Sequence, residues 1–527
     1  MKKLIFIAIT AAIIFTNFSY AQSSNFTDKE LGTIPDRITN IVRSPDLRHI
    51  ALLAIVNAKN QIILDGVPGP LYDTIGEKSI IFSPDSNHIA YVALQNNKQM
   101  VVVDGNQGPQ FDGIIKDSIV FSADSKRFAY LGKNGNTTIV VLDNQPITFE
   151  ENIDAKSIPL FSGDGKRVAF IAWKGSKRLV VVDGKPQPGY DDISFLAFGP
   201  KNNNFVYGAR KSTKRMVIFE GKQGNEFDEI GKVLAFSSNG KSFAYRARTA
   251  AKWQVIVNDS NLPPYDEVLE GSISFSPDSN HLAYAVKSNF KQMVVLDGNT
   301  AQPFDMIGQS MPIFLNDNHL LYTAKYGFQW QVIVDQTPGP LFDNIKYDSL
   351  RISPDKNHFA FAGWVNNKWF IVVDNKQQSE CDDFTGSIIF SPDSSRTAYI
   401  IKRSNKDIVV IDGTAGEEYD EIKKTILFSP DSKHLQYIAK KNGMWQTILD
   451  GKPGKAYNDI PEESILFSAD SSHTIYMAKA YDKQMLVVDG IESPAYDIIV
   501  SYPAVSENGF ETLTARGKTL FRTTWKP

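Results

Sequence analysis

The chain of 527 residues contains a single cysteine, Cys381. One thiol excludes an intramolecular disulfide and any zinc site that needs two or more thiolates. Its position also argues against a lipid anchor on a cysteine at the N-terminus. Neither sign of charge is in large excess, because the formal net charge is −3. We therefore find no electrostatic basis for binding nucleic acid or anionic membrane surfaces.

Long hydrophobic runs are absent beyond the first 21 residues. There, Lys2 and Lys3 precede an apolar run, Leu4–Phe15, and the small residues Ser19–Ala21 follow. This order is typical of a secretory signal peptide, and the run is too short for a membrane span of about 20 residues. We expect cleavage after Ala21, a mature chain that begins at Gln22 without a transmembrane segment, and a periplasmic or secreted location.

Enzyme motifs are also missing. The sequence has neither the G-x-S-x-G of α/β-hydrolases nor the H-E-x-x-H of zinc proteases. Cys381 occupies a position that is tyrosine in other repeats, which favours a packed thiol over a nucleophile. The sequence therefore predicts no catalytic residues, no metal and no cofactor, and it favours a protein without enzymatic activity.

A repeated unit fills most of the chain. Its most regular mark is an apolar residue before a Ser-Pro-Asp or similar turn, and the copies recur every 37 to 40 residues. The series begins at Arg43 and continues through Phe82, Phe121, Phe161, Phe198, Phe236, Phe275, Phe314, Ile352, Phe390, Phe428 and Phe467. Such a period indicates a solenoid, a propeller or an array.

The unit itself predicts four short β-strands. In the copy after Ser79, "SIIFS" and "HIAYVAL" flank a Pro-Asp turn, and "QMVVVD" ends at an Asp-Gly turn, a strong hairpin signal. "GPQFDGI" (108–114) completes the unit as the fourth strand. Four short strands in about 40 residues, with third strands apolar on both faces, are typical of a β-propeller blade.

The two ends of the chain supply one further blade. "GTIPDRI" (32–38) matches the fourth-strand pattern, whereas residues 500–527 provide three strands without a fourth. We expect a signal peptide (1–21), a segment that gives the closing strand (22–40), twelve repeats (41–499) and the strands of a shared closing blade (500–527). The fold is predicted to be all-β with about thirteen four-stranded blades. Two tandem rings of six and seven blades are favoured over one large ring.

With "FSPDSNHIAY" followed by "VVVDG", the repeats resemble the WD40-like Pro-Asp repeats of the TolB type, which occur in exported bacterial β-propellers. The resemblance extends over about residues 41–499. It implies the propeller fold and an exported protein. It implies no particular activity, because propellers support many unrelated functions.

An acid, a hydroxyl and an imidazole recur together, as in "SPDSNH" at 83–88. All seven histidines occupy this one position of the unit. Packed sheets lie about 10 Å apart, so neighbouring copies cannot easily share one metal ion. We interpret Asp85 and His88 as a turn-closing pair, and the repeated Asp-Gly and Tyr/Phe-Asp acids as turn and packing residues.

Function is expected where the repeats differ, and the tryptophans differ. Six flank the hairpin between the second and third strands: Trp173, Trp253, Trp330, Trp364, Trp369 and Trp445. They form a candidate binding rim, although they could equally cover blade edges. The sequence thus favours an exported, non-catalytic scaffold for protein–protein interaction in the bacterial envelope. The alternative is an envelope carbohydrate-binding protein, or a hydrolase or lyase with its site at a propeller mouth. The partner is expected to be an envelope or extracellular protein, or a polysaccharide.

Overall fold

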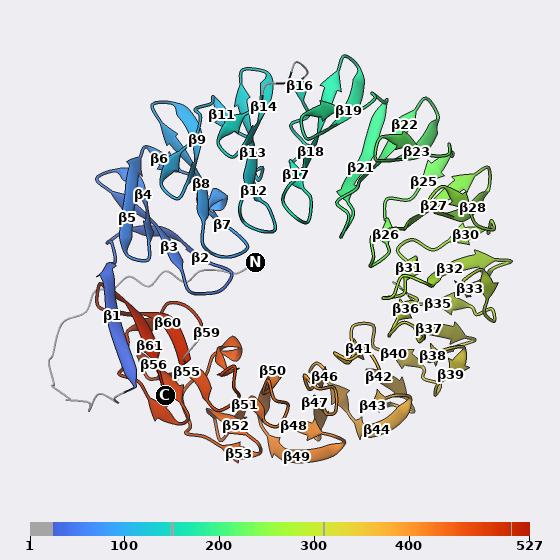
Figure 1. Cartoon of the computed structure of the whole chain (residues 1–527). Helices are drawn as coiled ribbons and strands as arrows, with labels where there is room; N and C mark the ends of the chain where they lie inside the picture. Colours follow the sequence, from blue (N-terminus) through green and yellow to red (C-terminus); the bar gives the residue numbers. More distant parts are fainter. Residues whose placement is uncertain (1–24, 148, 150–151, 309–310, 507–508) are drawn as a thin grey trace.

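The computed structural model describes residues 25–147, 149, 152–308, 311–506 and 509–527. The predicted signal peptide lies outside these residues. They form thirteen antiparallel sheets of four or five strands (Figure 1). Within the described ranges the only helical segments are two single turns, η1 (Glu77–Ser79) and η2 (Glu462–Ser464). No helix in this part of the chain is both long and apolar enough to cross a membrane.

Each sheet is one blade, numbered here from 1 to 13 in chain order. The central second strands are β3 (Ile50–Val56), β8 (Ile89–Gln95), β13 (Phe128–Asn134), β18 (Val168–Lys174), β22 (Phe205–Lys211), β27 (Phe243–Thr249), β32 (Leu282–Ser288), β37 (Leu320–Tyr326), β42 (Phe359–Val365), β47 (Thr397–Arg403), β51 (Leu435–Lys441), β55 (Thr474–Ala480) and β60 (Gly509–Arg516). The third strands are β4 (Lys59–Leu64), β9 (Lys98–Val103), β14 (Thr137–Leu142), β19 (Lys177–Val182), β23 (Lys214–Phe219), β28 (Lys252–Val257), β33 (Lys291–Leu296), β38 (Gln329–Val334), β43 (Lys368–Val373), β48 (Lys406–Ile411), β52 (Met444–Leu449), β56 (Lys483–Val488) and β61 (Thr519–Trp525).

The first strand of most blades is broken into two short pieces that pair with the same second strand. The first strands are β2 (Ile38–Arg43), β6 (Thr74–Ile75) with β7 (Ile81–Phe82), β11 (Gly113–Ile114) with β12 (Val120–Phe121), β16 (Asn152–Ile153) with β17 (Leu160–Phe161), β21 (Asp192–Phe198), β25 (Glu229–Ile230) with β26 (Ala235–Phe236), β30 (Glu267–Val268) with β31 (Ser274–Phe275), β35 (Met306–Ile307) with β36 (Ile313–Phe314), β40 (Asn344–Ile345) with β41 (Arg351–Ile352), β45 (Asp383–Phe384) with β46 (Ile389–Phe390), β50 (Glu421–Phe428), β54 (Leu466–Phe467), and β58 (Ile498–Ile499) with β59 (Ala504–Ser506).

The fourth strands form the other edge of each sheet. They are β5 (Val67–Tyr72), β10 (Asn106–Gln107), β15 (Gln145–Pro146), β20 (Lys185–Pro186), β24 (Lys222–Gln223), β29 (Ser260–Asn261), β34 (Asn299–Thr300), β39 (Thr337–Pro338), β44 (Lys376–Cys381), β49 (Thr414–Tyr419), β53 (Lys452–Pro453), β57 (Ile491–Glu492) and β1 (Phe26–Thr33). The predicted fourth strand 108–114 is divided between two blades. Phe111 bridges to Gln99 of blade 2, whereas β11 already pairs with β13 of blade 3. The chain therefore crosses between blades at Asp112.

The thirteen blades lie around one ring (Figure 1). Clusters of buried hydrophobic side chains join each blade to the next in chain order, and a further cluster joins blade 13 to blade 1. Two separate rings would need an early blade to pack against its own ring's last blade. No cluster among the described residues joins blades in that way, so the two tandem rings favoured by the sequence are not seen.

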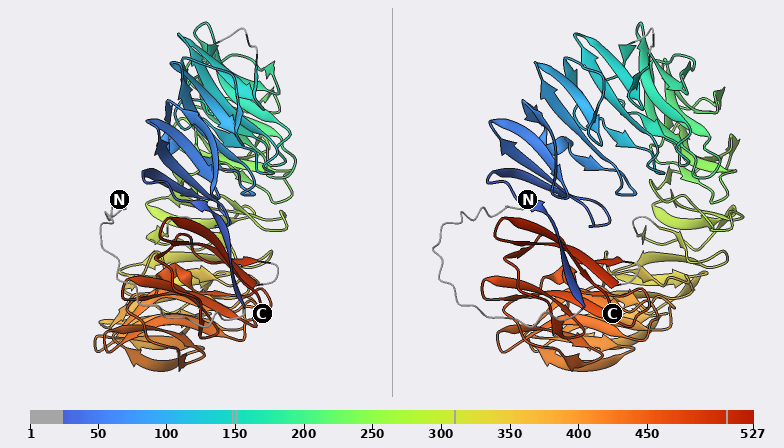
Figure 2. Two further views of the ribbon diagram at one scale, coloured as in Figure 1. Left: turned by 90° about the vertical axis from the view of Figure 1, so that its left-hand side faces the viewer. Right: turned by 60° about the vertical axis from the view of Figure 1, so that its left-hand side comes forward.

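Strands from the two ends of the chain form blade 13. β1 pairs antiparallel with β61, and Phe26 lies opposite Trp525 (Figure 2). This strand begins earlier than the sequence pattern suggested, because only the end of β1 overlaps the segment 32–38. Ile38 instead begins β2 of blade 1. The pairing leaves β61 without an open edge.

Candidate functional site

The repeated histidines connect two turns of the same blade. His88 Nδ1 lies 2.7 Å from Asp104 Oδ2, and Asp104 Oδ1 accepts the N–H of Ile89 at 2.9 Å. The corresponding histidine–aspartate pair occurs seven times, at His49, His88, His281, His319, His358, His434 and His473. Arginine takes the same role at Arg127, Arg167 and Arg396. Asp85 closes its own turn by accepting the N–H of Asn87, as expected, but it does not pair with His88, because the hairpin places the Asp-Gly turn beside the imidazole.

Asp85 has a different task in the same turn. Its Oδ1 accepts hydrogen bonds from the hydroxyl of Ser83 and the N–H of Asn87. The backbone N–H of Asp85 donates a hydrogen bond to Ser125 Oγ of the next blade at 3.0 Å. In blade 9 the equivalent residue is Asp355. Hydrogen bonds of the same kind lower its pKa to about 2, and the bond from the Ser353 hydroxyl has the largest effect. A carboxyl held ionised by its own turn is unsuited to exchanging protons near neutral pH.

The Tyr/Phe-Asp acids link successive blades at the opposite end of the strands. Asp112 accepts a hydrogen bond from Lys98 Nζ of blade 2 at 2.7 Å and another from Gly135 N of blade 3 at 2.7 Å. The bond from Lys98 is the main cause of the lowered pKa of Asp112. The same arrangement recurs at Asp191, Asp228, Asp266, Asp305, Asp382, Asp420 and Asp497. These carboxylates connect each of these blades to the next at this end of the strands.

All six candidate tryptophans are half-buried at this opposite end. Trp364 and Trp369 lie opposite each other in one hairpin, with ring centroids 5.3 Å apart. The other four rings each lie beneath a cation: Trp173 beneath Arg178, Trp253 beneath Arg246, Trp330 beneath Lys325 and Trp445 beneath Lys423. The structure thus gives these rings packing partners within the propeller.

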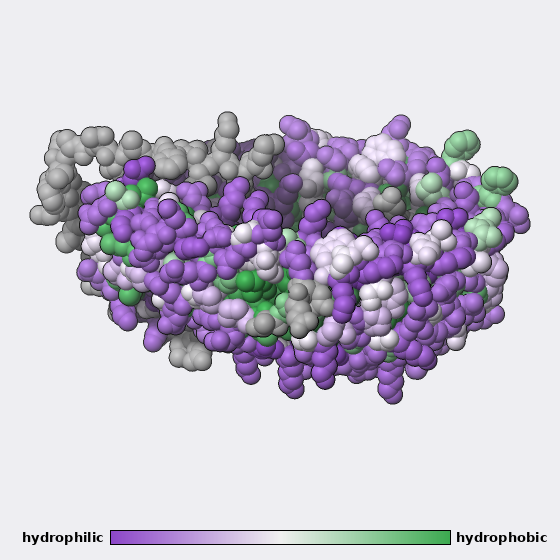
Figure 3. Space-filling view, turned by 90° about the horizontal axis from the view of Figure 1, so that it is seen from above, coloured by the Kyte–Doolittle hydropathy of each residue, from purple (hydrophilic) through white to green (hydrophobic). Residues whose placement is uncertain are grey.

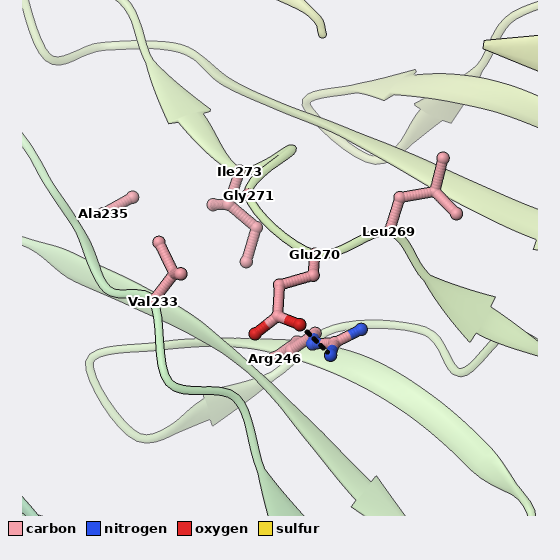
Figure 4. A pocket seen from close by; sticks show the side chains of 7 residues that line it. All are labelled: Val233, Ala235, Arg246, Leu269, Glu270, Gly271 and Ile273. Atoms are coloured by element: carbon pink, nitrogen blue, oxygen red, sulfur yellow. Dashed lines mark hydrogen bonds and ion pairs between the residues drawn. The ribbon is translucent and has the colours of Figure 1, made fainter. Parts of the chain in front are cut away.

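The second residue of each third strand lies beside a notch between successive blades. A hollow of about 590 Å³ lies beside Gln99, between blades 2 and 3, and one of about 290 Å³ lies beside Arg215, between blades 5 and 6. At the next notch Arg246 extends from Trp253 to Glu270 of blade 7, with its Nη2 3.0 Å from Glu270 Oε2 (Figure 4). The space that remains there is about 10 Å³, enough for about one water molecule. The ion pair of Arg246 with Glu270 lies in this notch.

The two most exposed of the large hydrophobic side chains are aromatic residues that the sequence analysis did not select. Phe290 and Phe328 are each 92% exposed, and Tyr326 is 65% exposed. They lie in the two-residue hairpin turns of blades 7 and 8 or directly beside them, and we call them the aromatic tips. Hydrophobic side chains project at the right-hand edge of Figure 3, the side on which β33 and β38 lie in Figure 1.

A local signal could have revealed these tips. The corresponding turns of blades 2 and 9 hold Asn96–Asn97 and Asn366–Asn367, as expected for left-handed backbone, whereas the turn of blade 12 holds Tyr481, which is 86% exposed. Phe290 has φ 65°, a conformation that a bulky side chain adopts only at a cost. An exposed phenylalanine in such a turn contributes neither to the core nor to the turn.

Other candidate chemistry is sparse in the part of the chain that the structure describes. No group of three or more His, Cys, Asp or Glu residues is arranged there to hold a metal ion. Cys381 is buried, and burial raises the pKa of its thiol to about 12. It is therefore a packed side chain at the edge of blade 9, unsuited to nucleophilic attack.

Comparison with known proteins finds only distant structural similarity. No protein-family model and no curated protein matches the chain. Solved structures that resemble it include TolB from Acinetobacter baumannii, with 17% identity and a TM-score of 0.19 over 51% of this chain and 64% of that one. They also include the Dos1 propeller, with 13% identity and a TM-score of 0.24 over 74% of this chain and 94% of that one.

Proposed function

We propose that this protein is an exported, non-catalytic β-propeller scaffold that binds a protein partner in the bacterial cell envelope through the aromatic tips. The main observation behind this proposal is the exposure of Phe290 and Phe328 on adjacent blades. Exposed aromatic side chains of this kind are the anchors around which protein interfaces form. The fold is compatible with such a role, since propellers present many loops on a rigid frame.

One tryptophan lies directly beside the aromatic tips. Trp330 lies two residues from Phe328 in the same hairpin, where Lys325 covers its ring. A rigid base reduces the conformational entropy lost when the tips are buried by a partner. The signal-like N-terminus and the resemblance to exported TolB-type repeats support the envelope location. Intact-mass analysis of the exported protein should find a chain that begins at Gln22.

A matched set of variants tests the tips. The double variant Phe290→Asn with Phe328→Asn places asparagine in turns that already hold it in other blades, so the fold should be unaffected. Asn367→Ser, in the corresponding turn of blade 9, is the control. Mature protein is used as bait in envelope extract, and the captured partner is then titrated in purified form. We expect the double variant to bind at least about tenfold more weakly, since interface anchors typically contribute about 2 kcal/mol or more.

The control and the wild type should bind the partner equally. If the double variant retains full affinity while its melting temperature is unchanged, the aromatic tips are not the contact surface. Capture of a polysaccharide in place of a protein, by wild type and control alike, would support the carbohydrate-binding alternative instead.

A further inference from the structure

The turns between first and second strands of blades 3 to 6 each contain a lysine, and two of them lack the usual aspartate. In most blades the turn carries an aspartate at the position of Asp85, but blade 5 has Lys201 there and blade 6 has Asn239. The turns of these four blades also carry Lys126, Lys166 and Lys241, all exposed. We call Lys126, Lys166, Lys201 and Lys241 the basic arc. The corresponding turns of blades 7 and 8 contain aspartate and neither lysine nor arginine.

Hydrogen bonds between blades make this arc continuous. Arg127 Nη1 donates to the carbonyl of Lys166 in the next blade at 2.9 Å, and Arg167 Nη1 donates to that of Asn203 at 3.0 Å. Asn202 Nδ2 then donates to the carbonyl of Gly240 at 3.1 Å. Each of the four turns is therefore fixed to its neighbour, and the lysines lie in a row on a rigid support.

The charge of the arc is compensated only in part. Lys166 Nζ lies 3.7 Å from Asp164, but the lysine side chain is 83% exposed, so this pair is weak. No ion pair is found for Lys126, Lys201 or Lys241 among the described residues. Asp124 and Asp164 share the turns of Lys126 and Lys166 and interact with them electrostatically, whereas the turns of Lys201 and Lys241 contain no acid. Asp143 and Asp183 pair with Arg127 and Arg167. Two exposed lysines in neighbouring turns, Lys185 and Lys222, add further positive charge at the same end of the strands.

The arrangement suits an extended, negatively charged chain. The turns after β12, β17, β21 and β26 lie toward the centre of the ring and follow its curve (Figure 1). Packed sheets are spaced by about 10 Å, so a chain laid along the curve would meet one lysine per blade. A flat membrane could not follow a concave line, and membrane-binding surfaces also need an apolar anchor. None of the exposed large hydrophobic side chains lies in these turns.

The absence of aromatic side chains in the four turns also separates two kinds of polyanion. Proteins that bind single-stranded nucleic acid stack bases on aromatic rings, whereas carboxylated or sulfated sugars need only cations and hydrogen-bond donors. We therefore infer that the basic arc binds a linear acidic polysaccharide, on blades other than those of the proposed protein-binding tips. This inference goes beyond the proposed function and does not depend on it.

Two double variants at matched positions test the inference. Lys166→Gln with Lys201→Gln removes half of the basic arc. Lys356→Gln with Lys433→Gln removes two lysines from the same turns of blades 9 and 11, where each turn retains its aspartate. Binding to polygalacturonate, with neutral dextran as a blank, is measured by calorimetry at low salt. We expect the arc variant to bind about fivefold more weakly or worse, because each exposed charge contact contributes up to about 1 kcal/mol.

The control double variant should bind within about twofold of the wild type, and affinity for polygalacturonate should fall steeply as salt is raised from about 50 to 200 mM. Equal losses in both double variants, or no binding of polygalacturonate at low salt, would overturn the inference. Tighter binding of a single-stranded oligothymidylate would show that the ligand class is wrong. The tip variant Phe290→Asn with Phe328→Asn should retain polysaccharide binding, which separates this surface from the proposed protein contact.

Discussion

Phe26 offers the most direct test of how the ring closes. Its side chain is 4% exposed and packs into the cluster that joins blades 12 and 13, together with Trp525 and Phe510. Replacing a buried phenylalanine with alanine typically costs about 3 to 5 kcal/mol, because apolar contacts are lost and a cavity remains. We expect Phe26→Ala to lower the free energy of unfolding by about 3 kcal/mol. This is the low end of the range, since a terminal strand can shift to fill part of the cavity.

Asp28, two residues along β1, gives a second measure of the same contact. Its Oδ1 accepts hydrogen bonds from the Tyr496 hydroxyl at 2.8 Å and from the Thr523 hydroxyl at 2.7 Å, and its Oδ2 pairs with Arg516 at 2.8 Å. Asp28→Ala would leave the buried Tyr496 hydroxyl without its acceptor, at about 1 to 3 kcal/mol, whereas the Thr523 hydroxyl keeps the Thr514 hydroxyl as a partner at 2.8 Å. Lys29→Ala, an exposed change on the same strand, should alter stability by less than about 0.5 kcal/mol.

The assay must report on the closing blade, because a protein of this size need not unfold in one step. Hydrogen exchange followed by mass spectrometry resolves peptides from residues 509–525 and, as an internal reference, from β32 in blade 7. We expect residues 509–525 to exchange faster in Phe26→Ala and Asp28→Ala than in the wild type. In Lys29→Ala they should exchange at the wild-type rate. If Phe26→Ala exchanged like Lys29→Ala throughout, the pairing of β1 with β61 would not be closing the ring.

Three further outcomes are expected from the contacts of single residues. His88→Asn loses the hydrogen bond to Asp104 at an exposed site, so urea denaturation should show a change of about 1 kcal/mol or less, with no loss of partner binding. NMR titration should find the pKa of His281 above its usual 6.5, because its hydrogen bond to Asp297 favours the charged ring, and Asp297→Asn should abolish the shift. The stability that this pair adds is fully present below pH 6.5 and is lost as pH rises through the raised pKa. Trp445→Ala should lower the melting temperature, because its half-buried ring packs beneath Lys423, and should leave affinity for the partner within about threefold.

The blades could be predicted because their signals are local. An Asp-Gly turn, a Ser-Pro-Asp turn and the apolar strands between them each lie within a few residues of one another, and the observed second and third strands follow this pattern. The number of rings has no such signal. The number of rings depends on the angle between neighbouring sheets. This angle is set by side chains packed across each blade interface, which lie far apart in the sequence.

The partner of His88 illustrates the same limit within one blade. Asp85 is close in sequence, but the hairpin formed by β8 and β9 brings Asp104 beside the imidazole. Likewise, the sequence placed the tryptophans at one end of the strands and left open whether they bind a partner or cover blade edges. Trp445 is covered by Lys423, which comes from an earlier strand of the same sheet. Contacts of this kind follow from register, which is a property of paired strands.

Because the aspartate, histidine and arginine contacts recur from blade to blade, they cannot distinguish one blade from another, and a partner that bound them would bind everywhere. Selective binding requires departures from the repeat, and two departures lie at opposite ends of the strands. The aromatic tips occupy the hairpins between second and third strands in blades 7 and 8, whereas the basic arc occupies the turns between first and second strands in blades 3 to 6. Antiparallel strands place these two sets of turns at opposite ends of a blade. A protein held at the tips and a polysaccharide held along the arc would therefore not compete, and simultaneous binding of both would connect the two partners.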